Sequence, residues 1–357
     1  MKAAILSVAD PRALAATSIY TSYFEKRGIE YDVICTNRYG KGGTFFSGEL
    51  YQYDFEFKPD VNKFSKLLPF LRFRKYALNV LESNNYDFIV AWNENTILLF
   101  SDVLLKMGVP YTANFRDFDF ARNFLFNALR KKVCKNAIAV TSPCKTTPSF
   151  MQEYRPVQIV SLQPDLPPGA IEKAQQHLDP INISYIGTFR PQHAQSAKSF
   201  INALGNDMRF FLRYIGTGTE SLQQFVEEKE LRNVEIRGTF AMDEIGDILN
   251  QADIVNSCYG SFPYVEYLLM SIKMGYAIRT KIPLIVGREA TEVANTIEQY
   301  GIGFVIDDFN NLGDKIYSWY VNLDYQKYSA DCDRYIEDTD VINGKLYKKM
   351  DEELYVR

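Results

Sequence analysis

Short apolar runs that alternate with amphipathic segments limit most strongly what this 357-residue chain can fold into. Residues 3–8 form an apolar run that only Ser7 interrupts, and residues 16–24 then repeat apolar side chains three and four positions apart, up to Gly28. The same pairing recurs along both halves of the chain. A fully apolar run is typical of a strand buried on both faces, and parallel strands need a crossover, usually a helix. The pattern therefore predicts an α/β protein with parallel sheets covered on both faces.

A segment rich in proline separates two such patterns. Residues 163–180 contain four prolines and Gly169, and strand and helix signals restart after them. We predict two doubly wound, Rossmann-like domains. The first comprises residues 1–165; residues 166–180 are a linker; residues 181–335 form the second domain; and residues 336–357 form a helix that packs back on the first. Such sheets bind ligands at the carboxyl ends of their strands, so a ligand between two of them would lie in a cleft.

Composition excludes several classes of protein. Hydrophobic residues make up 46% and charged residues 24% of the chain, as in ordinary globular proteins. No run approaches the roughly 20 apolar residues of a membrane span, and the first run is too short for a signal peptide. Five scattered cysteines without a CxxC pair argue against a disulfide framework or a zinc site and favour the cytoplasm. The two histidines leave little material for metal binding or histidine-dependent nucleophiles.

Two glycine turns follow predicted strands of the second half. Gly187 and Thr188 come directly after the run at 183–186, and Gly216, Gly218 and Thr219 follow the run at 210–215. Glycine lets backbone N–H groups approach an anion closely, and the start of the next helix adds a favourable dipole. Both turns are candidates for phosphate binding, with an ordinary tight turn as the alternative.

The order of the segments in the second half resembles the GT-B fold glycosyltransferases, specifically the large retaining family that uses sugar nucleotides. The resemblance rests on ISYIGTF, FFLRYIGTGTES, VEIRGTFAMDEIGDILNQADIVN, KIPLIV and QYGIGFVID, which lie between about residues 183 and 310. The first half is similar to the family only in the order of its strand-like and helix-like segments. The resemblance implies two Rossmann-like domains facing across a cleft, the first of which (residues 1–165) binds the acceptor and the second (residues 181–335) the sugar nucleotide. It also implies a UDP- or GDP-linked sugar as donor substrate, with neither a cofactor nor a metal ion.

The resemblance also implies roles for individual residues. Arg190 and Lys198 would neutralise the diphosphate leaving group as the glycosidic bond breaks; for Lys198, a solvated helix face is the alternative. Lys273 keeps the family's ten-residue spacing to Pro283, but Leu268 and Tyr276 occupy the two positions where the family has glutamates. Glu266 is a possible substitute. The predicted donor-binding residues are Gly187, Thr188, Gly216, Gly218, Thr219, Gly238, Tyr259, Gly260, Ser261, Glu266 and Lys273.

Acid–base chemistry is less visible in the sequence. Asp10 follows the first strand and is a candidate for orienting or deprotonating an acceptor hydroxyl, although capping of its loop is the simpler interpretation. The Asp-x-Asp pairs at 117–119 and 331–333 match a metal motif of a different glycosyltransferase fold, and we interpret both as chance matches. His193, close to the first glycine turn, is interpreted as a polar loop residue.

The two halves differ in charge. Residues 1–170 hold 21 basic and 16 acidic side chains, and the remainder holds 19 and 28. Within residues 58–75, cations alternate with Phe and Leu, which suits an anionic membrane surface on the inner face of the cell membrane. An amphipathic helix with a wet basic face, interrupted by Pro69, is the alternative. Nucleic-acid binding is disfavoured, because the whole chain is acidic and carries no recognition motif. The predicted membrane or acceptor residues are Lys63, Lys66, Arg72, Arg74 and Lys75.

These observations favour a glycosyltransferase that moves a sugar from a nucleotide sugar to a glycan or lipid-linked acceptor, in surface polysaccharide or glycoconjugate synthesis. The alternative is a catalytically silent GT-B-like subunit that binds a partner glycosyltransferase or a protein substrate, which the missing glutamate pair would explain. A nicotinamide-dependent oxidoreductase is disfavoured, because no glycine follows the first strand until Gly28.

Overall fold

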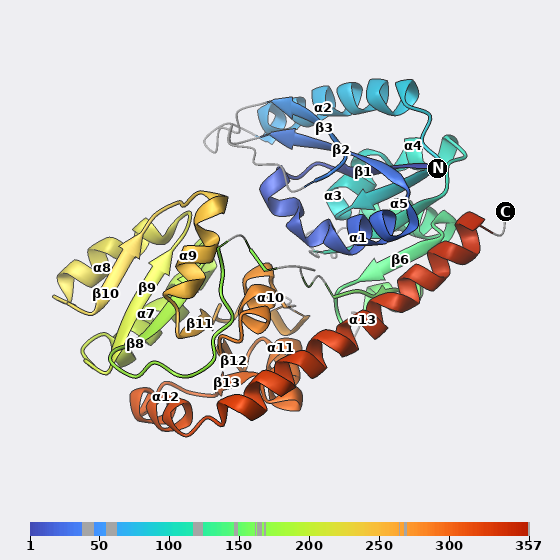
Figure 1. The fold of residues 1–357 in the computed structure, drawn as a ribbon. Coiled ribbons are helices and arrows are strands. Elements are labelled where there is room, and N and C mark those ends of the chain that lie inside the picture. Colours follow the sequence, from blue (N-terminus) through green and yellow to red (C-terminus); the bar gives the residue numbers. More distant parts are fainter. Residues whose placement is uncertain are drawn as a thin grey trace. The chain divides into compact units, whose positions relative to one another are not determined.

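The computed structural model divides the chain into two compact units (Figure 1). One unit comprises Met1–Ser161 with Asp340–Arg357, and the other comprises Leu162–Thr339. The structure describes residues 1–37, 46–54, 63–116, 124–145, 149–160, 162, 166–167, 169–263, 265–267 and 270–355. The predicted pair of doubly wound α/β folds is confirmed, because each unit has one parallel sheet with the strand order of a Rossmann fold.

The first unit contains a seven-stranded sheet in the order β3-β2-β1-β4-β5-β6-β7. Its central strand β1 pairs in parallel with β2 and β4, and its residues Ala3 to Leu6 are fully buried, as the apolar run predicts. The strands are β1 Lys2–Ser7, β2 Glu30–Asn37, β3 Glu49–Asp54, β4 Phe88–Trp92, β5 Tyr111–Asn114, β6 Ala139–Ser142 and β7 Val157–Gln158. The helices are η1 Pro11–Thr17, α1 Ser18–Arg27, α2 Lys63–Ser83, α3 Glu94–Leu99, α4 Ser101–Lys106, α5 Phe124–Asn136 and α6 Ser149–Gln152.

Helix α2 corrects one sequence prediction. Pro69 was expected to interrupt the helix, but α2 runs through it without a break. A proline inside a helix costs about 3 kcal/mol, because it lacks an N–H and its ring meets the preceding turn. The side chains of Phe73, Ala77 and Leu81 lie in the core of the first unit, and their burial offsets this local cost.

The second unit contains a six-stranded parallel sheet in the order β10-β9-β8-β11-β12-β13. The strands are β8 Ile181–Ile186, β9 Phe210–Ile215, β10 Val234–Arg237, β11 Ile254–Ser257, β12 Leu284–Gly287 and β13 Gly303–Ile306. The α-helices are α7 Ala194–Leu204, α8 Gln223–Glu228, α9 Ile245–Asn250, α10 Ile272–Arg279, α11 Thr291–Tyr300, α12 Leu312–Val321 and α13 Tyr325–Tyr355. Short 3-10 turns are η2 Pro191–His193, η3 Thr219–Leu222, η4 Met242–Glu244 and η5 Val265–Tyr267.

Two segments, the expected linker and the last helix, lie differently in the structure from what the sequence predicts. The described residues of the expected linker belong to the second unit, where the Lys173 ammonium donates to the Asn250 carbonyl (2.8 Å). The last helix, α13, begins at Tyr325, well before the expected residue 336. Its final part belongs to the first unit, where Tyr23 donates to Asp351 (2.7 Å).

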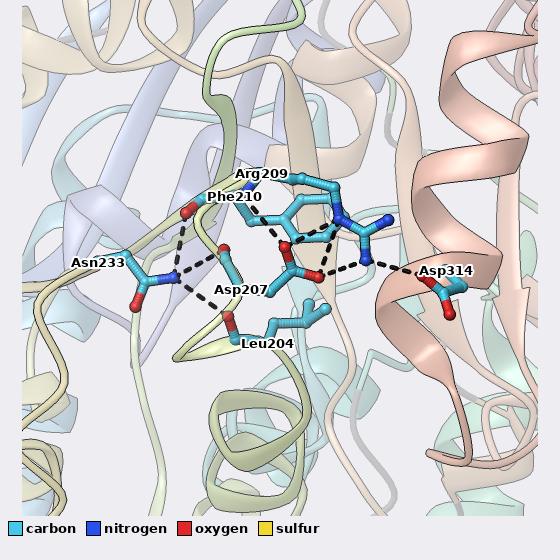
Figure 2. Close-up of polar contacts among 6 residues, drawn as sticks. All are labelled: Leu204, Asp207, Arg209, Phe210, Asn233 and Asp314. Atoms are coloured by element: carbon cyan, nitrogen blue, oxygen red, sulfur yellow. Dashed lines mark hydrogen bonds and ion pairs between the residues drawn. The ribbon is translucent and has the colours of Figure 1, made fainter.

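Polar side chains stabilise the turn between α7 and β9 in the second unit (Figure 2). The side-chain amide of Asn233 lies 3.1 Å from each of three backbone carbonyls, those of Leu204, Asp207 and Phe210. Arg209 donates to both Asp207 and Asp314 at the start of α12. These contacts fix the amino end of β9, which leaves the carboxyl ends of the strands, where the glycine turns lie, for ligand binding.

Candidate active site

The two predicted glycine turns lie side by side at the carboxyl ends of β8 and β9. A Cβ on Gly216 would overlap the Gly187 carbonyl oxygen, and a Cβ on Gly218 would overlap the Phe189 carbonyl oxygen. The second turn therefore needs glycine to pack closely against the first. A Cβ on Gly187 would meet no atom within 4 Å, and the amide of Thr188 has no hydrogen-bond partner in the described part of the chain. The first turn is thus the open one.

The second turn is less suited to an anion than predicted. The amide of Gly218 already donates to the Glu220 carboxylate (2.9 Å), and a Cβ on Gly238 would overlap the same carboxylate. The Thr219 hydroxyl is buried and donates to the carbonyls of Gly216 (2.8 Å) and Arg237 (2.9 Å). The Glu220 carboxylate therefore accepts the hydrogen bond that was expected to go to a phosphate. Gly218, Thr219 and Gly238 stabilise the loop itself.

His193 connects the first turn to the sheet. It is buried, and its Nδ1 accepts a hydrogen bond from the Arg190 amide (3.2 Å) and lies 3.1 Å from the hydroxyl of Tyr185 on β8. The Tyr185 hydroxyl also lies 2.9 Å from the Thr188 carbonyl, to which it donates. Burial, with the charges of Lys273 and Arg190, lowers the pKa of His193 to about 4, so the ring is neutral near pH 7. The expectation that His193 is merely a polar loop residue is wrong: the ring is a buried support for the Arg190 backbone.

Lys273 lies over two aromatic rings beside this turn. Its ammonium is 3.6 Å from the centroid of the Tyr185 ring and 4.9 Å from that of Tyr259. It lies in the first turn of α10 and forms no ion pair or hydrogen bond with a described residue. Burial lowers the pKa of Lys273 to about 7, although the nearby Cys258 opposes this shift. The ammonium therefore lies against two ring faces, and no described side chain supplies it with an anionic partner.

Arg190 is the second cation of the site. It is exposed, and the structure gives its guanidinium no carboxylate partner among the described residues. Its charge lowers the pKa of Tyr185 and of Tyr259 against the larger, raising effect of burial, so Arg190 acts on the same two rings that lie under the Lys273 ammonium. The structure thus has, at an open glycine turn, two cations that find no counter-ion among the described residues, an arrangement that suits a diphosphate.

The loop after β11 closes the other side of the site. Gly260 has a φ of +79°, and a Cβ there would lie 2.9 Å from Ser196 Cβ near the start of α7. Its amide donates to the Glu289 carboxylate (2.9 Å), and the Tyr259 hydroxyl lies 3.3 Å from the Ser271 hydroxyl. The predicted residues Tyr259 and Gly260 therefore do lie with Lys273, and Ser261 is exposed next to them.

Other residues predicted to bind the donor do not lie in the group formed by Arg190 and Lys273. The Lys198 ammonium is 5.2 Å from the centroid of the Phe225 ring on α8. Glu266 is exposed on η5, and no described residue binds its carboxylate. Tyr276, in one missing glutamate position, is buried in α10, and Leu268, in the other, lies outside the described residues. The structure does not bring Lys198 or Glu266 into the group formed by Arg190 and Lys273.

The predicted residues of the first unit form no comparable group. Asp10 follows β1 and is buried, which limits its reach toward an acceptor. Arg74 is bound to Asp102 (2.8 Å), whereas Arg72 and Lys75 are exposed on α2. Lys63 and Lys66 lie on α2, and their side chains fall outside the described part of the chain.

The Asp-x-Asp pairs give no support for a metal site. The pair at 117–119 falls outside the described residues. Asp331 and Asp333 on α13 are bound to cations instead, Asp331 to Arg334 (3.0 Å) and Asp333 to Lys281. Within the described ranges, no group of His, Cys, Asp and Glu side chains is arranged to hold a metal ion. No described helix combines the length and apolar content that crossing a bilayer requires.

Two functional candidates escaped the sequence patterns, Tyr185 and Glu289. Tyr185 is a strand residue like its apolar neighbours, and only its contact with Lys273 distinguishes it. Glu289 follows β12 after Gly287 and Arg288, and the glycine two positions earlier was the one available signal. Tyr185 lies in β8, far along the chain from its partner Lys273. Glu289 lies after β12, far along the chain from its partner Gly260.

Residues 183–353, just under half of the chain, match the family model described as glucosyltransferase 3-like, C-terminal domain. No curated protein sequence matches the chain. The matched segment begins in β8 and includes the whole candidate site, so the family evidence and the geometry concern the same residues.

Several solved structures share the fold along nearly the whole chain. Sucrose-phosphate synthase from Thermosynechococcus elongatus has a TM-score of 0.70 at 12% identity, with 98% of this chain and 99% of that chain covered. The Anabaena protein HepE in complex with UDP and glucose has a TM-score of 0.61 at 12% identity, with 98% and 99% covered. UDP-GlcNAc 2-epimerase from Neisseria meningitidis bound to UDP-GlcNAc has a TM-score of 0.56 at 12% identity, with 95% and 99% covered. Residues 183–353 are similar to the glucosyltransferase 3-like C-terminal domain, and the chain as a whole has the GT-B fold.

Proposed function

We propose that the protein transfers a sugar from a nucleotide sugar to a glycan or lipid-linked acceptor, and that the second unit binds the donor through its diphosphate. The observation that carries the proposal is the pair of cations, Arg190 and Lys273, to which no described residue offers a carboxylate, at the open turn of Gly187. Unpaired cations next to a free backbone amide favour an anion with several oxygens. The structural neighbours bound to UDP with glucose, and to UDP-GlcNAc, support a uridine diphosphate sugar.

The same residues account for a chemical role. As the glycosidic bond breaks, negative charge develops on the departing diphosphate. Arg190 and the protonated form of Lys273 would stabilise that charge from two sides, while neutral His193 holds the Arg190 backbone. We infer retention of configuration at the transferred sugar, as in the retaining family that the motif order resembles, and a role in surface polysaccharide or glycoconjugate synthesis.

Isothermal titration calorimetry with UDP, GDP, ADP and their glucose conjugates tests the donor proposal. We expect one nucleotide to bind with a dissociation constant in the micromolar to low millimolar range, about −8 to −4 kcal/mol. Its affinity should fall at least about tenfold in Lys273→Met, because a buried or half-buried charge-assisted contact contributes about 1.5–3 kcal/mol. If none of these ligands binds at millimolar concentration, the silent-subunit alternative becomes the better description.

We also propose that the first half of α2 contacts an anionic membrane surface. The side chains of Leu67, Leu68 and Leu71 are 49%, 49% and 47% exposed, and the exposed cations Arg72 and Lys75 follow on the same helix. Apolar groups can enter the interfacial region while each nearby cation adds about 1 kcal/mol of attraction. Such contact would bring the enzyme to a lipid-linked acceptor.

Sedimentation with liposomes tests this surface. The double variant Arg72→Gln, Lys75→Gln should lose about 2 kcal/mol of attraction, and hence most of its binding to phosphatidylserine-containing liposomes at low salt. Lys345→Gln with Lys348→Gln on α13 makes the same change of charge elsewhere and should bind like the wild type. Equal sedimentation of the two double variants would show that the basic face of α2 is only solvated.

A further inference from the structure

Glu289 has a carboxylate that the backbone places at the carboxyl end of β12. Both of its oxygens fold back over Gly287, where a Cβ would overlap them. One oxygen, Oε1, accepts the amide hydrogen of Gly260 (2.9 Å). Glycine at position 287 therefore leaves the room that this carboxylate needs, and the sequence Gly287-Arg288-Glu289 sets its position.

Within the described part of the chain, no cation neutralises this carboxylate. The neighbouring Arg288 binds Glu298 (2.6 Å) and Asp307 (2.7 Å) instead. Among the described residues, none forms an ion pair with Glu289, and its second oxygen, Oε2, has no hydrogen-bond partner. The residue is half-buried. A partly desolvated carboxylate is stabilised when its remaining lone pairs accept hydrogen bonds, so Oε2 is available to a donor from a ligand.

Glu289 also belongs to the surroundings of the proposed diphosphate site. The pKa of the buried Cys258 thiol is raised by burial and by the charge of Glu289, and is lowered by that of Lys273. Both charged groups are therefore near Cys258. Gly260, which Glu289 holds, directly follows Tyr259, whose ring lies under the Lys273 ammonium. The parts of a nucleotide sugar next to its diphosphate are the ribose and the transferred sugar, and both carry hydroxyl groups that donate to carboxylates.

We propose that Glu289 is a specificity-determining residue that accepts a hydrogen bond from a sugar hydroxyl of the bound donor, on the ribose or on the transferred sugar. This inference rests on the proposed function. It assigns to Glu289 the hydrogen bond with a sugar hydroxyl. The two other candidate positions are less suitable, because Tyr276 is buried and Glu266 is exposed without a partner among the described residues. The two sources of the hydroxyl share one chemistry, and the ligand series distinguishes them.

The test measures the affinity of the wild type and of Glu289→Gln for UDP and UDP-glucose by calorimetry. It then asks whether the effect of the substitution disappears when a ligand hydroxyl is removed. Glutamine keeps a carbonyl oxygen for the Gly260 amide but loses the charge. If the ribose is the partner, both ligands should bind at least about tenfold more weakly, the size of a lost charge-assisted hydrogen bond. If glucose is the partner, UDP should bind as in the wild type and UDP-glucose about tenfold more weakly.

Deoxygenated ligands separate a hydroxyl contact from a loop support. Ligands lacking the partner hydroxyl, 2′- or 3′-deoxy-UDP for the ribose and 2- or 3-deoxyglucose conjugates for the sugar, should bind the wild type and Glu289→Gln with similar affinity. Glu230→Gln, at an exposed carboxylate shortly before β10, is the matched control and should bind every ligand like the wild type, and Glu266→Gln is measured beside it.

The outcomes are distinguishable. Equal affinity of wild type and Glu289→Gln for both UDP and UDP-glucose would overturn the inference, as would an equal loss for parent and deoxygenated ligands, which marks a support of the Gly260 loop. Coupling at Glu266 instead would also overturn it. If the wild type binds neither ligand, the donor proposal itself fails and the inference falls with it.

Discussion

Replacing Arg190 with alanine is expected to lower kcat/KM for sugar transfer by about 10²–10³-fold, the loss typical when one group that stabilises developing charge is removed. Arg190 is exposed, and its guanidinium forms no ion pair with a described residue. The free energy of unfolding should therefore change by no more than about 0.5 kcal/mol. Steady-state kinetics with the donor found by calorimetry, together with thermal unfolding, measure the two effects separately.

Two control variants make this prediction specific. Arg190→Lys keeps the charge but loses the planar group that binds two phosphate oxygens, so it should fall between the wild type and Arg190→Ala. Arg232→Ala removes an equally exposed arginine just before β10, at the opposite end of the sheet, and should turn over like the wild type. Unchanged turnover in Arg190→Ala would remove Arg190 from the mechanism.

Lys273 should make donor affinity depend on pH above neutrality. Its pKa is about 7 in the free protein, because burial disfavours the charged ammonium. A bound diphosphate favours that charge, so the complex holds more protons than the free protein above pH 7. Affinity should then be constant below about pH 7 and fall by up to tenfold per pH unit above it, until the higher pKa of the complex is reached.

Calorimetry with UDP-glucose from about pH 6 to pH 9 measures this effect, because the diphosphate diester itself does not titrate there. Repeating it in buffers with different ionisation enthalpies measures proton uptake. The groups that face Lys273 are accounted for: His193 stays neutral, with a pKa of about 4, and burial raises the pKa values of the tyrosines and the thiol. The neighbouring charged or titratable residues are Tyr185, Arg190, His193, Cys258, Tyr259 and Glu289.

Two substitutions test whether Lys273 is the group that takes up the proton when the donor binds. Lys273→Arg is always charged, so its affinity should be nearly independent of pH. Lys273→Met should bind weakly at every pH and take up no proton. A wild-type profile that is flat across this range, or a slope that persists in Lys273→Met, would contradict the assignment.

Much of the fold could be predicted from local patterns. The mainly apolar runs of β1 and β9 and the spacing of Ile19, Tyr23 and Phe24 in α1 specify their own elements, since burial follows from the position of each side chain along a strand or helix. Strand β3, Glu49–Asp54, was missed, because its residues are half-buried and polar and lack an apolar run. Helix α2 continued through Pro69 because packing in the core outweighs a local preference.

The candidate site was predictable only in part. Glycine turns and cations after strands are visible in the sequence, which is why Gly187, Arg190 and Lys273 were identified. Whether a glycine serves a ligand or another backbone is not visible: Gly216 and Gly218 are needed for packing against the first turn. Likewise, the partner of Arg74 is Asp102, a residue on another helix.

By itself, the sequence determined the two parallel α/β units and the place of their ligand-binding edge, because hydrophobic periodicity and glycine position act over a few residues. Only the tertiary structure decided which side chains share that edge. It puts the Lys273 ammonium over the Tyr185 ring and the Glu289 carboxylate against Gly260, although these residues lie far apart in the chain. The physical reason is that parallel pairing brings distant strands together, and the burial this creates sets the charge of each group.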